Sequence, residues 1–372
     1  MASIKSITHN IAQKKTIPSV QHLISLPNIA TTSRKLYSTT STSEHITKLL
    51  ENKELTKEDA TNELRWIIQG VRERAQNQMA KGKMPEIEED SISNMVERRS
   101  KGEPLQYILG TTDFGPITIQ CRKPILIPRQ ETSFLTLKLS SYILNLIPSL
   151  TSKDRPNKSL EILDLCSGTG CIGLLLSKLN PLINIIGIDN SPKAIQLSMI
   201  NSRDLNLNER VKFKYGNLFN SNINSLLSFT NSSLIPSSSL TTKTNLKGDG
   251  KYGMIISNPP YIPFNEYKNL PKSVKNFESP FALLGDNNLN QNFGKGLKYY
   301  ERINEILPNL LIEQENLEKN GWKGLPRLVL EIGKGQSNDV IDILRNGGLI
   351  KKTEIWKDQF GVERFILAWT KK

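Results

Sequence analysis

The chain has 372 residues and a formal net charge of +13, and 37% of its residues are hydrophobic. This length is sufficient for a large α/β core and one small extra domain. Three cysteines and three histidines argue against a disulfide framework and a metal cluster. The sequence contains no run of about 18 apolar residues, so no membrane span is expected.

The first 43 residues form a basic leader that is rich in serine and threonine and contains no acidic residue. Its positive charges come from Lys5, Lys14, Lys15, Arg34 and Lys35. Apolar residues are spaced along the leader, and this pattern is typical of a mitochondrial transit peptide, with a disordered basic tail as the alternative. We therefore predict a protein of the mitochondrial matrix with residues 1–43 as its transit peptide.

Residues 44–104 are predicted to form a small helical domain. Leu64, Ile67 and Val71 recur at the spacing that places apolar side chains on one face of a helix. The next segment, residues 105–130, is predicted to be a β-hairpin linker.

Residues 131–372 are predicted to form an α/β domain. Leu160 to Leu165 has the pattern of a buried strand, and Ile172 to Leu179 has the pattern of a helix start. Residues 220–250 are rich in Ser, Asn and Thr and show little periodicity, so they predict a flexible insertion.

A glycine-rich loop joins this first strand to its helix. The loop residues are Cys166, Ser167, Gly168, Thr169 and Gly170. The two glycines let the backbone turn tightly and approach a ligand, which the N–H groups at the helix start also face. A lone Gly-x-Gly is shared by nucleotide-binding folds and some structural turns, so the loop needs the support of further features.

Asp189 provides that support at the end of the next predicted strand, Asn184 to Ile188. An acidic residue about 20 positions after the glycines suits the two hydroxyls of a ribose. Asp189 could also cap the helix that opens at Ser191-Pro192, and the two roles are compatible.

The most informative motif is Asn258-Pro259-Pro260-Tyr261, which follows an apolar run ending at Ser257. Two prolines cannot continue a strand, so the motif is expected at a strand's carboxyl end, where open α/β sheets bind ligands. The Asn258 side-chain oxygen and the Pro259 carbonyl can accept both hydrogens of one NH2 group, beside the flat face of Tyr261. The motif therefore predicts a site for a planar amide or an exocyclic amine, with a proline-rich turn as the structural alternative.

Two cofactors suit the glycine loop. Gly168, Gly170 and Gly173 have the spacing of a dinucleotide-binding loop, as in nicotinamide dehydrogenases. Asp164 and the pair Cys166-Ser167 suit instead a ligand with an amino-acid end, such as S-adenosylmethionine. Only methyl transfer gives the Asn258 motif a function, namely to present a nitrogen nucleophile to the methyl group, and we predict this chemistry.

Further motifs flank these two sites. They are residues 102–110 (GEPLQYILG), Phe114-Gly115, residues 127–132 (IPRQET), residues 277–280 (FESP), residues 330–333 (LEIG) with Gln336, and Lys357-Asp358 through Gly361 to Arg364. In this order they resemble the release-factor glutamine methyltransferases (the PrmC/HemK family), from about residue 95 to the C-terminus.

The resemblance implies a Rossmann-like class I S-adenosylmethionine-dependent methyltransferase fold with a small N-terminal helical domain that engages the protein substrate. The implied substrate is the glutamine of the Gly-Gly-Gln motif of a peptide-chain release factor, here a mitochondrial one, methylated on its N5 amide nitrogen. We expect a monomer without a stable nucleic-acid partner. The alternatives are an adenine-N6 or other nucleic-acid methyltransferase, which needs a base-flipping pocket, and an inactive cofactor-binding assembly protein.

Each motif then has an expected role. The predicted cofactor contacts are Cys166, Ser167, Gly168, Thr169, Gly170, Asp189, Asn217, Leu218 and Asn258, with Asn217 and Leu218 near the adenine. The predicted catalytic and substrate contacts are Asn258, Pro259, Pro260 and Tyr261, with Phe114 as a further substrate contact. Arg129, Glu131 and Thr132 would close over the site, although Glu131 could instead cap a helix beginning at Ser133.

Overall fold

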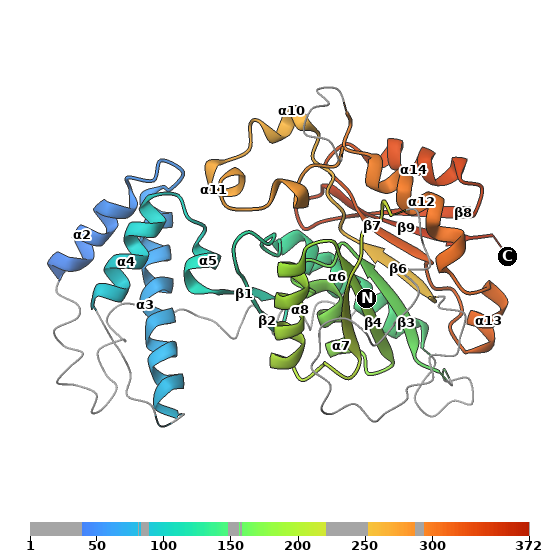
Figure 1. Ribbon diagram of the computed structural model, residues 1–372, viewed down its shortest axis with the longest axis horizontal. Helices are drawn as coiled ribbons and strands as arrows, with labels where there is room; N and C mark the ends of the chain where they lie inside the picture. The colour runs from blue at the N-terminus through green and yellow to red at the C-terminus, as the bar shows by residue number, and fades with distance from the viewer. Residues whose placement is uncertain are drawn as a thin grey trace. The chain divides into compact units, whose positions relative to one another are not determined.

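The computed structural model describes residues 39–80, 82, 89–147, 156, 158–220, 252–286 and 294–371. Most of the predicted leader and of the predicted insertion at 220–250 therefore lies outside the described residues. The chain divides into two compact units, Met1–Lys101 and Gly102–Lys372, whose elements are labelled in Figure 1. No helix within the described ranges is long and apolar enough to cross a membrane.

The first unit is built from helices. They are α2 (Thr39–Leu49), α3 (Lys57–Ala80) and α4 (Glu89–Ser100). Helix α3 begins with reciprocal bonds, because the Asp59 N–H donates to the Thr56 hydroxyl (3.1 Å) and the Thr56 N–H donates to the Asp59 carboxylate (3.0 Å). The buried guanidinium of Arg99 donates to the Glu63 carboxylate at 2.9 Å and joins α4 to α3. Since α2 begins at Thr39, a leader of 43 residues would end inside this helix.

The second unit opens with the short helix α5 (Leu105–Leu109) and an antiparallel hairpin of β1 (Thr111–Phe114) and β2 (Ile117–Gln120). The linker predicted as a hairpin therefore begins with a helical turn. This turn forms because Pro104 restrains φ at its start and Gly110 ends it in the left-handed conformation (φ 80°).

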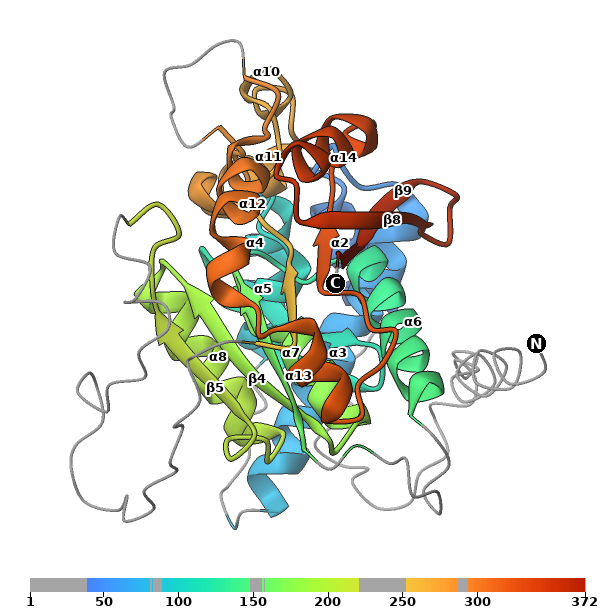
Figure 2. The same cartoon turned by 90° about the vertical axis from the view of Figure 1, so that its right-hand side faces the viewer.

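Within the described residues of the second unit, seven strands form one sheet with the order β5-β4-β3-β6-β7-β9-β8. Figure 2 shows β4 and β5 on one side of this sheet and β8 and β9 on the other. The strands are β3 (Leu160–Leu165), β4 (Ile183–Asp189), β5 (Val211–Tyr215), β6 (Met254–Ser257), β7 (Leu328–Glu331), β8 (Ile350–Lys357) and β9 (Glu363–Thr370). Strands β3 to β7 run parallel, and β9 runs antiparallel to β7 and β8. This mostly parallel sheet confirms the predicted α/β fold class.

Helices cover both faces of the sheet. The longer ones are α6 (Gln130–Leu146), α7 (Cys171–Leu179), α8 (Pro192–Asp204), α12 (Lys298–Leu310) and α14 (Ser337–Asn346). The short ones are α10 (Phe264–Tyr267), α11 (Lys272–Lys275), the 3-10 helix η3 (Pro280–Ala282) and α13 (Gln314–Lys319). Neighbouring residues of β3 point to opposite faces: Ile162 belongs to the core cluster of Leu139 and Leu175, and Leu163 to that of Ile303 and Leu344. Helices α6 and α7 thus pack on one face, and α12 and α14 on the other.

The carboxyl ends of the parallel strands lie at one edge of the sheet. The chain runs from β3 outward to β4 and β5 and then returns to β6, on the other side of β3. The direction of the strand order therefore reverses between β3 and β6, where open α/β sheets bind ligands. Leu165 and Ser257 are paired at this point, so the glycine loop and the Asn258 motif leave the sheet beside each other.

Candidate active site

The glycine loop turns sharply over the end of β3. Cys166 (φ 60°), Gly168 (φ 54°) and Gly170 (φ 79°) all adopt the left-handed conformation. A Cβ atom on Gly170 would lie 2.4 Å from the ring of Phe213, whereas a Cβ on Gly168 would have no atom within 4 Å. Gly170 is therefore required for the close packing of the loop on the sheet, and Gly168 borders open space.

Asp189, the last residue of β4, is bonded directly to this loop. Its carboxylate accepts hydrogen bonds from the backbone N–H groups of Gly168 and Ser191, both at 2.8 Å. Burial raises the pKa of the Asp189 carboxyl, and the backbone N–H groups oppose that rise. Ser191 caps α8 by accepting from the Ala194 N–H (3.3 Å), so the helix-capping role falls to Ser191 and not to Asp189.

Asp164 is a buried carboxylate beside the same loop. It is 1% exposed, and neither of its oxygens makes a full hydrogen bond within the described residues. Burial raises the pKa of Asp164 to about 7, while the nearby Gly173 N–H offsets part of the rise. The Ser167 hydroxyl is also buried without a partner among these residues. Buried polar groups normally have partners. Carboxylate and hydroxyl oxygens can both accept hydrogen bonds from an ammonium group, so the chemistry of these two side chains fits the amino-acid end of S-adenosylmethionine.

Asn217 and Leu218 follow β5 at the same edge of the sheet. The backbone N–H of Gly216, which precedes them, donates to the Asp189 carbonyl (3.0 Å) and joins this loop to the end of β4. The Asn217 side chain accepts from the Phe219 N–H at 3.0 Å and closes its own turn. Leu218 is buried in the core cluster that includes Ile188 and Tyr299, and the adenine contacts of Asn217 and Leu218 stay a prediction.

The Asn258 motif leaves β6 next to the glycine loop. The Ser257 hydroxyl donates to the Leu165 carbonyl at 2.8 Å and fixes the start of the motif. Pro259 and Pro260 are buried, and Asn258 and Tyr261 are partly exposed. The structure thus brings the two motifs together at the switch point, with the polar side chain of Asn258 accessible to a substrate.

Two long-range contacts hold the start of α6 near this site. Both Glu278 carboxylate oxygens accept from the Arg129 guanidinium at 2.8 Å, and the Thr132 hydroxyl donates to Glu331 at 2.7 Å. Helix α6 begins at Gln130 with Arg129 at its N-cap position, so the alternative that Glu131 caps a helix at Ser133 is wrong.

Glu331 is a buried acid that the sequence reasoning left outside the site. Burial raises its pKa to about 7, and the Thr132 hydroxyl and the charge of Arg364 oppose the rise. Burial and the Glu331 charge also raise the pKa of the Tyr261 phenol, which keeps that ring neutral. The sequence signal that could have identified Glu331 is an apolar strand that ends in a carboxylate, which is the same pattern that identified Asp189.

Phe114 does not line the substrate site. Its side chain is 0% exposed and belongs to the core cluster that includes Ile117, Ile119 and Leu135. The prediction of a substrate contact is therefore corrected. Phe114 anchors the β1–β2 hairpin to α6, because an aromatic ring at a hairpin end is more stable in the core than in water.

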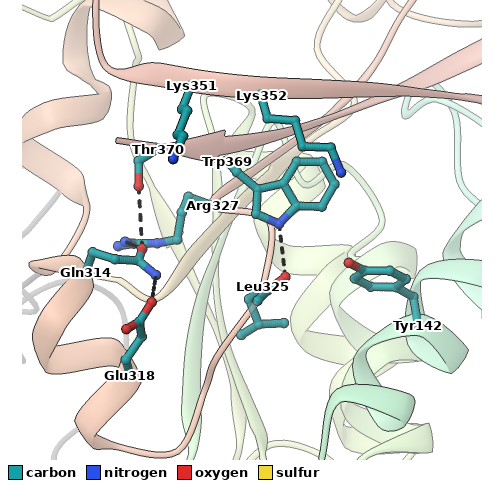
Figure 3. A pocket seen from close by; sticks show the side chains of 10 residues that line it. Tyr142, Gln314, Glu318, Leu325, Arg327, Lys351, Lys352, Trp369 and Thr370 are labelled. Carbon is teal, nitrogen blue, oxygen red and sulfur yellow. Dashed lines mark hydrogen bonds between the residues drawn. The ribbon is translucent and has the colours of Figure 1, made fainter. Parts of the chain in front are cut away.

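Figure 3 shows a surface pocket of about 380 Å³ at the opposite ends of the parallel strands from the Asn258 motif. Arg327 precedes β7 and Thr370 ends the antiparallel β9, so the pocket lies at the amino ends of the parallel strands. The Arg327 guanidinium donates to Gln314 (2.6 Å) and to the carbonyls of Gly253 (2.8 Å) and Ile312 (2.6 Å). These contacts hold the pocket wall, and none of the described residues that line it belongs to the predicted site.

Comparisons with known proteins match each of the two parts of the chain to a described protein family. Residues 156–255 match the family described as a methyltransferase domain, and residues 44–110 match the PrmC N-terminal domain. The release factor glutamine methyltransferase of Clostridium acetobutylicum is 30% identical over 286 residues, which cover 76% of this chain and 82% of the relative. The enzyme of the same name from Thermodesulfovibrio yellowstonii is 31% identical over 291 residues, covering 77% and 85%.

Proposed function

The chain belongs to the release factor glutamine methyltransferase family, whose members use S-adenosylmethionine, and from this premise we propose a specific substrate. It is the glutamine of the Gly-Gly-Gln motif of a mitochondrial peptide-chain release factor, methylated on the N5 amide nitrogen in support of translation termination. The observation that carries the proposal is the position of Asn258-Pro259-Pro260-Tyr261, which leaves β6 directly beside the glycine loop.

S-adenosylmethionine, when bound, supplies an electrophilic methyl group on a sulfonium centre. Asp164 and Ser167 would hold its amino-acid end, next to the backbone of Gly168 and Gly170. Asp189 would accept from the ribose hydroxyls, because its carboxylate has acceptor capacity beyond the two backbone N–H groups that it already binds.

An amide nitrogen is a poor nucleophile because its lone pair is delocalised into the carbonyl. The Asn258 side-chain oxygen and the Pro259 carbonyl would accept the two N–H bonds of the substrate amide, and this orients the lone pair away from them. The same two oxygens stabilise positive charge that develops on nitrogen, and the methylated amide becomes neutral again by losing one of its two N–H protons to solvent. Holding the nitrogen in this orientation supplies much of the acceleration, and Tyr261 covers the amide plane.

The test of the substrate is the intact mass of a purified mitochondrial release factor after incubation with the enzyme and S-adenosylmethionine. We expect a gain of one methyl group, located by peptide fragmentation on the Gly-Gly-Gln glutamine and absent when that glutamine is replaced. Duplex DNA, tRNA and rRNA serve as parallel substrates. Efficient methylation of a nucleic acid, with none of the release factor, would show that the motif holds a base and that the alternative function is correct.

The mitochondrial part of the proposal depends on the leader alone. A fluorescent reporter that carries residues 1–43 should enter mitochondria, because acid-free basic leaders with spaced apolar residues are typical import signals. The matched control neutralises Lys5, Lys14, Lys15, Arg34 and Lys35, and it should stay in the cytosol. A cytosolic location of the unmodified fusion removes the mitochondrial claim and leaves the methyltransferase claim standing.

A further inference from the structure

The side chain of Gln336 connects the Asn258 motif to two other segments. Its amide nitrogen donates to the Tyr261 carbonyl (2.9 Å) and to the Lys295 carbonyl (2.8 Å). Its amide oxygen accepts from the Gly333 N–H (2.8 Å) and lies 3.5 Å from the Tyr300 hydroxyl. One side chain thus joins the end of the motif, the segment before α12 and the loop after β7.

The partners of Gln336 leave only one orientation for its amide. The Tyr261 and Lys295 carbonyls can only accept, and the Gly333 N–H can only donate, so nitrogen and oxygen cannot be exchanged. Both amide hydrogens are used, and the amide oxygen accepts one full hydrogen bond, because the Tyr300 hydroxyl donates its single proton to the Glu331 carbonyl at 3.0 Å. Gln336 is 8% exposed, so water cannot easily replace these bonds. A buried amide that bonds three backbone groups holds these groups in fixed positions.

Two glycines make room for this arrangement. Gly296 adopts the left-handed conformation (φ 74°), and a Cβ atom on it would lie 2.1 Å from the Tyr261 carbonyl oxygen. A Cβ on Gly333 would lie 2.6 Å from the Gln336 amide oxygen. The backbone on both sides of Gln336 therefore approaches the motif more closely than any other residue type allows.

The short stretch between β6 and Tyr261 has few free torsions. Ser257 is held by pairing with Leu165 and Leu330 in the neighbouring strands. The rings of Pro259 and Pro260 fix φ at both positions. The path of the backbone that carries Asn258 and the Pro259 carbonyl therefore depends on what holds the two ends of this stretch.

The far end of the stretch is the peptide group between Tyr261 and Ile262. Its N–H donates to the Leu283 carbonyl at 2.9 Å, and its C=O accepts from Gln336. With only the Leu283 bond left, this peptide could rotate about the bond direction. Gln336 therefore completes the restraint, and its loss also leaves the carbonyls of Tyr261 and Lys295 without this buried donor.

We infer that Gln336 is a positioning residue for methyl transfer: through the Tyr261 carbonyl it sets the directions of the Asn258 and Pro259 oxygens that bind the substrate amide. Gln336 itself does not touch substrate or cofactor. The inference rests on the proposed function in one respect, because it takes those two oxygens as the acceptors of the substrate NH2 group.

The kinetic test uses Gln336→Leu, which keeps the approximate volume and removes the three hydrogen bonds of the amide. We expect kcat for the release factor to fall about ten- to a hundredfold, since small misplacements of substrate-binding groups cost rate on this scale. The KM for S-adenosylmethionine should stay within about twofold of the wild-type value, because the cofactor loop is not contacted. Asn304→Ala is the matched control, since its amide also bonds a backbone carbonyl between helices (Ile343, 2.8 Å) and has no bond to the motif.

A second variant separates positioning from general damage. In Gln336→Glu, the ionised carboxylate faces two carbonyl oxygens and can donate to neither. When protonated, it can donate one hydrogen bond. We expect kcat of Gln336→Glu, relative to wild type at each pH, to rise as the pH falls, while Gln336→Leu shows no such recovery.

A readout that needs no turnover completes the test. Hydrogen exchange in a peptide spanning residues 255–263 should be faster in Gln336→Leu than in wild type or Asn304→Ala, because the Tyr261–Ile262 peptide loses one of its two restraints. Unchanged exchange, unchanged kcat, a loss confined to the KM for S-adenosylmethionine, or an equal kcat loss in Asn304→Ala each overturns the inference. If the wild-type enzyme does not methylate the release factor, the proposed function fails, and the exchange experiment still decides the role of Gln336.

Discussion

Asn258 is the side chain on which the proposed chemistry depends most directly. Asn258→Ala removes one of the two oxygens that accept the substrate N–H bonds, and loss of one such bond typically lowers kcat about 10²–10³-fold. Binding of S-adenosylmethionine, measured by calorimetry, should change little. Methyl transfer measured with a radiolabelled donor gives the rate, and Asn269→Ala, an exposed asparagine in the following segment, is the control. Turnover of Asn258→Ala close to the wild-type rate contradicts the mechanism.

Asp189 connects the cofactor loop to the second strand of the sheet, and its substitution tests the ribose contact. Asp189→Asn keeps an acceptor for a backbone N–H and removes the charge, so we expect binding of S-adenosylmethionine to weaken by about 1.5–3 kcal/mol. Ser191→Ala is the control, because it removes the cap of α8 at a cost of about 1 kcal/mol of stability and leaves the ribose position intact. Equal affinities of Asp189→Asn and wild type would return Asp189 to a purely structural role.

Glu331 should make the free energy of unfolding depend on pH. Burial disfavours its charge and raises its pKa from 4.5, the ordinary value in an unfolded chain, to about 7 in the folded protein. Between these values the folded state binds the extra proton, so the free energy of unfolding falls as pH rises from about 4.5 to about 7. Glu331→Gln lacks this dependence and should gain stability relative to wild type over that range. Urea unfolding of both proteins at about pH 5 and pH 8 measures the difference, and a constant difference rules the effect out.

At the scale of residues, the sequence was sufficient to predict those parts of the site that are encoded by short local motifs. The glycine loop and Asn258-Pro259-Pro260-Tyr261 are short motifs whose position after a strand follows from backbone chemistry. The contact between Arg129 and Glu278 joins residues 149 positions apart, and no local pattern predicts it. Phe114 was predicted to contact the substrate as part of the linker, and its burial was not predicted because it depends on tertiary packing.

At the scale of elements, the turn from β3 into α7 depends on two glycines for different reasons. Gly170→Ala places a methyl group 2.4 Å from Phe213 in a left-handed backbone, and we expect a loss of stability above the roughly 1–3 kcal/mol of such backbone strain alone. Gly168→Ala has the same kind of strain and no steric contact, so it should be the less destabilising of the two. Its methyl group points into open space at the cofactor position and should instead weaken S-adenosylmethionine binding. Thermal unfolding and calorimetry separate these effects, and equal losses of stability contradict this account.

The elements themselves were predicted to different degrees. Buried strands such as β3 and β7 stand out as apolar runs with defined ends. Strand β8 was not predicted, because it has one covered and one exposed face at the border of the sheet and its sequence, IKKTEIWK, contains mainly polar residues. The antiparallel position of β9 between β7 and β8 also required the structure, since strand order depends on long-range pairing and not on local preference.

At the scale of the whole molecule, the two compact units allow binding and chemistry to be tested apart. Deletion of residues 44–100 removes the helices of the first unit and leaves the sheet of the second unit with its own core. If the helical unit engages the protein substrate, methylation of the intact release factor should fall sharply while S-adenosylmethionine binding persists. Methylation of a short Gly-Gly-Gln peptide is the control, because it should respond less to the deletion. Undiminished methylation of the intact factor excludes the proposed role.

The strand order has a further consequence for how copies of this protein behave in a crowded solution. In the described part of the sheet, β5 and β8 are the two edge strands. Strand edges expose unpaired N–H and C=O groups that can recruit a strand of another molecule and start aggregation. Here Lys212 and Lys214 lie on one edge strand, and Lys351, Lys352 and Lys357 on the other. Glu354 is the one acidic residue on these two strands, so two copies that met edge to edge would bring net positive charges together, which disfavours intermolecular growth of the sheet.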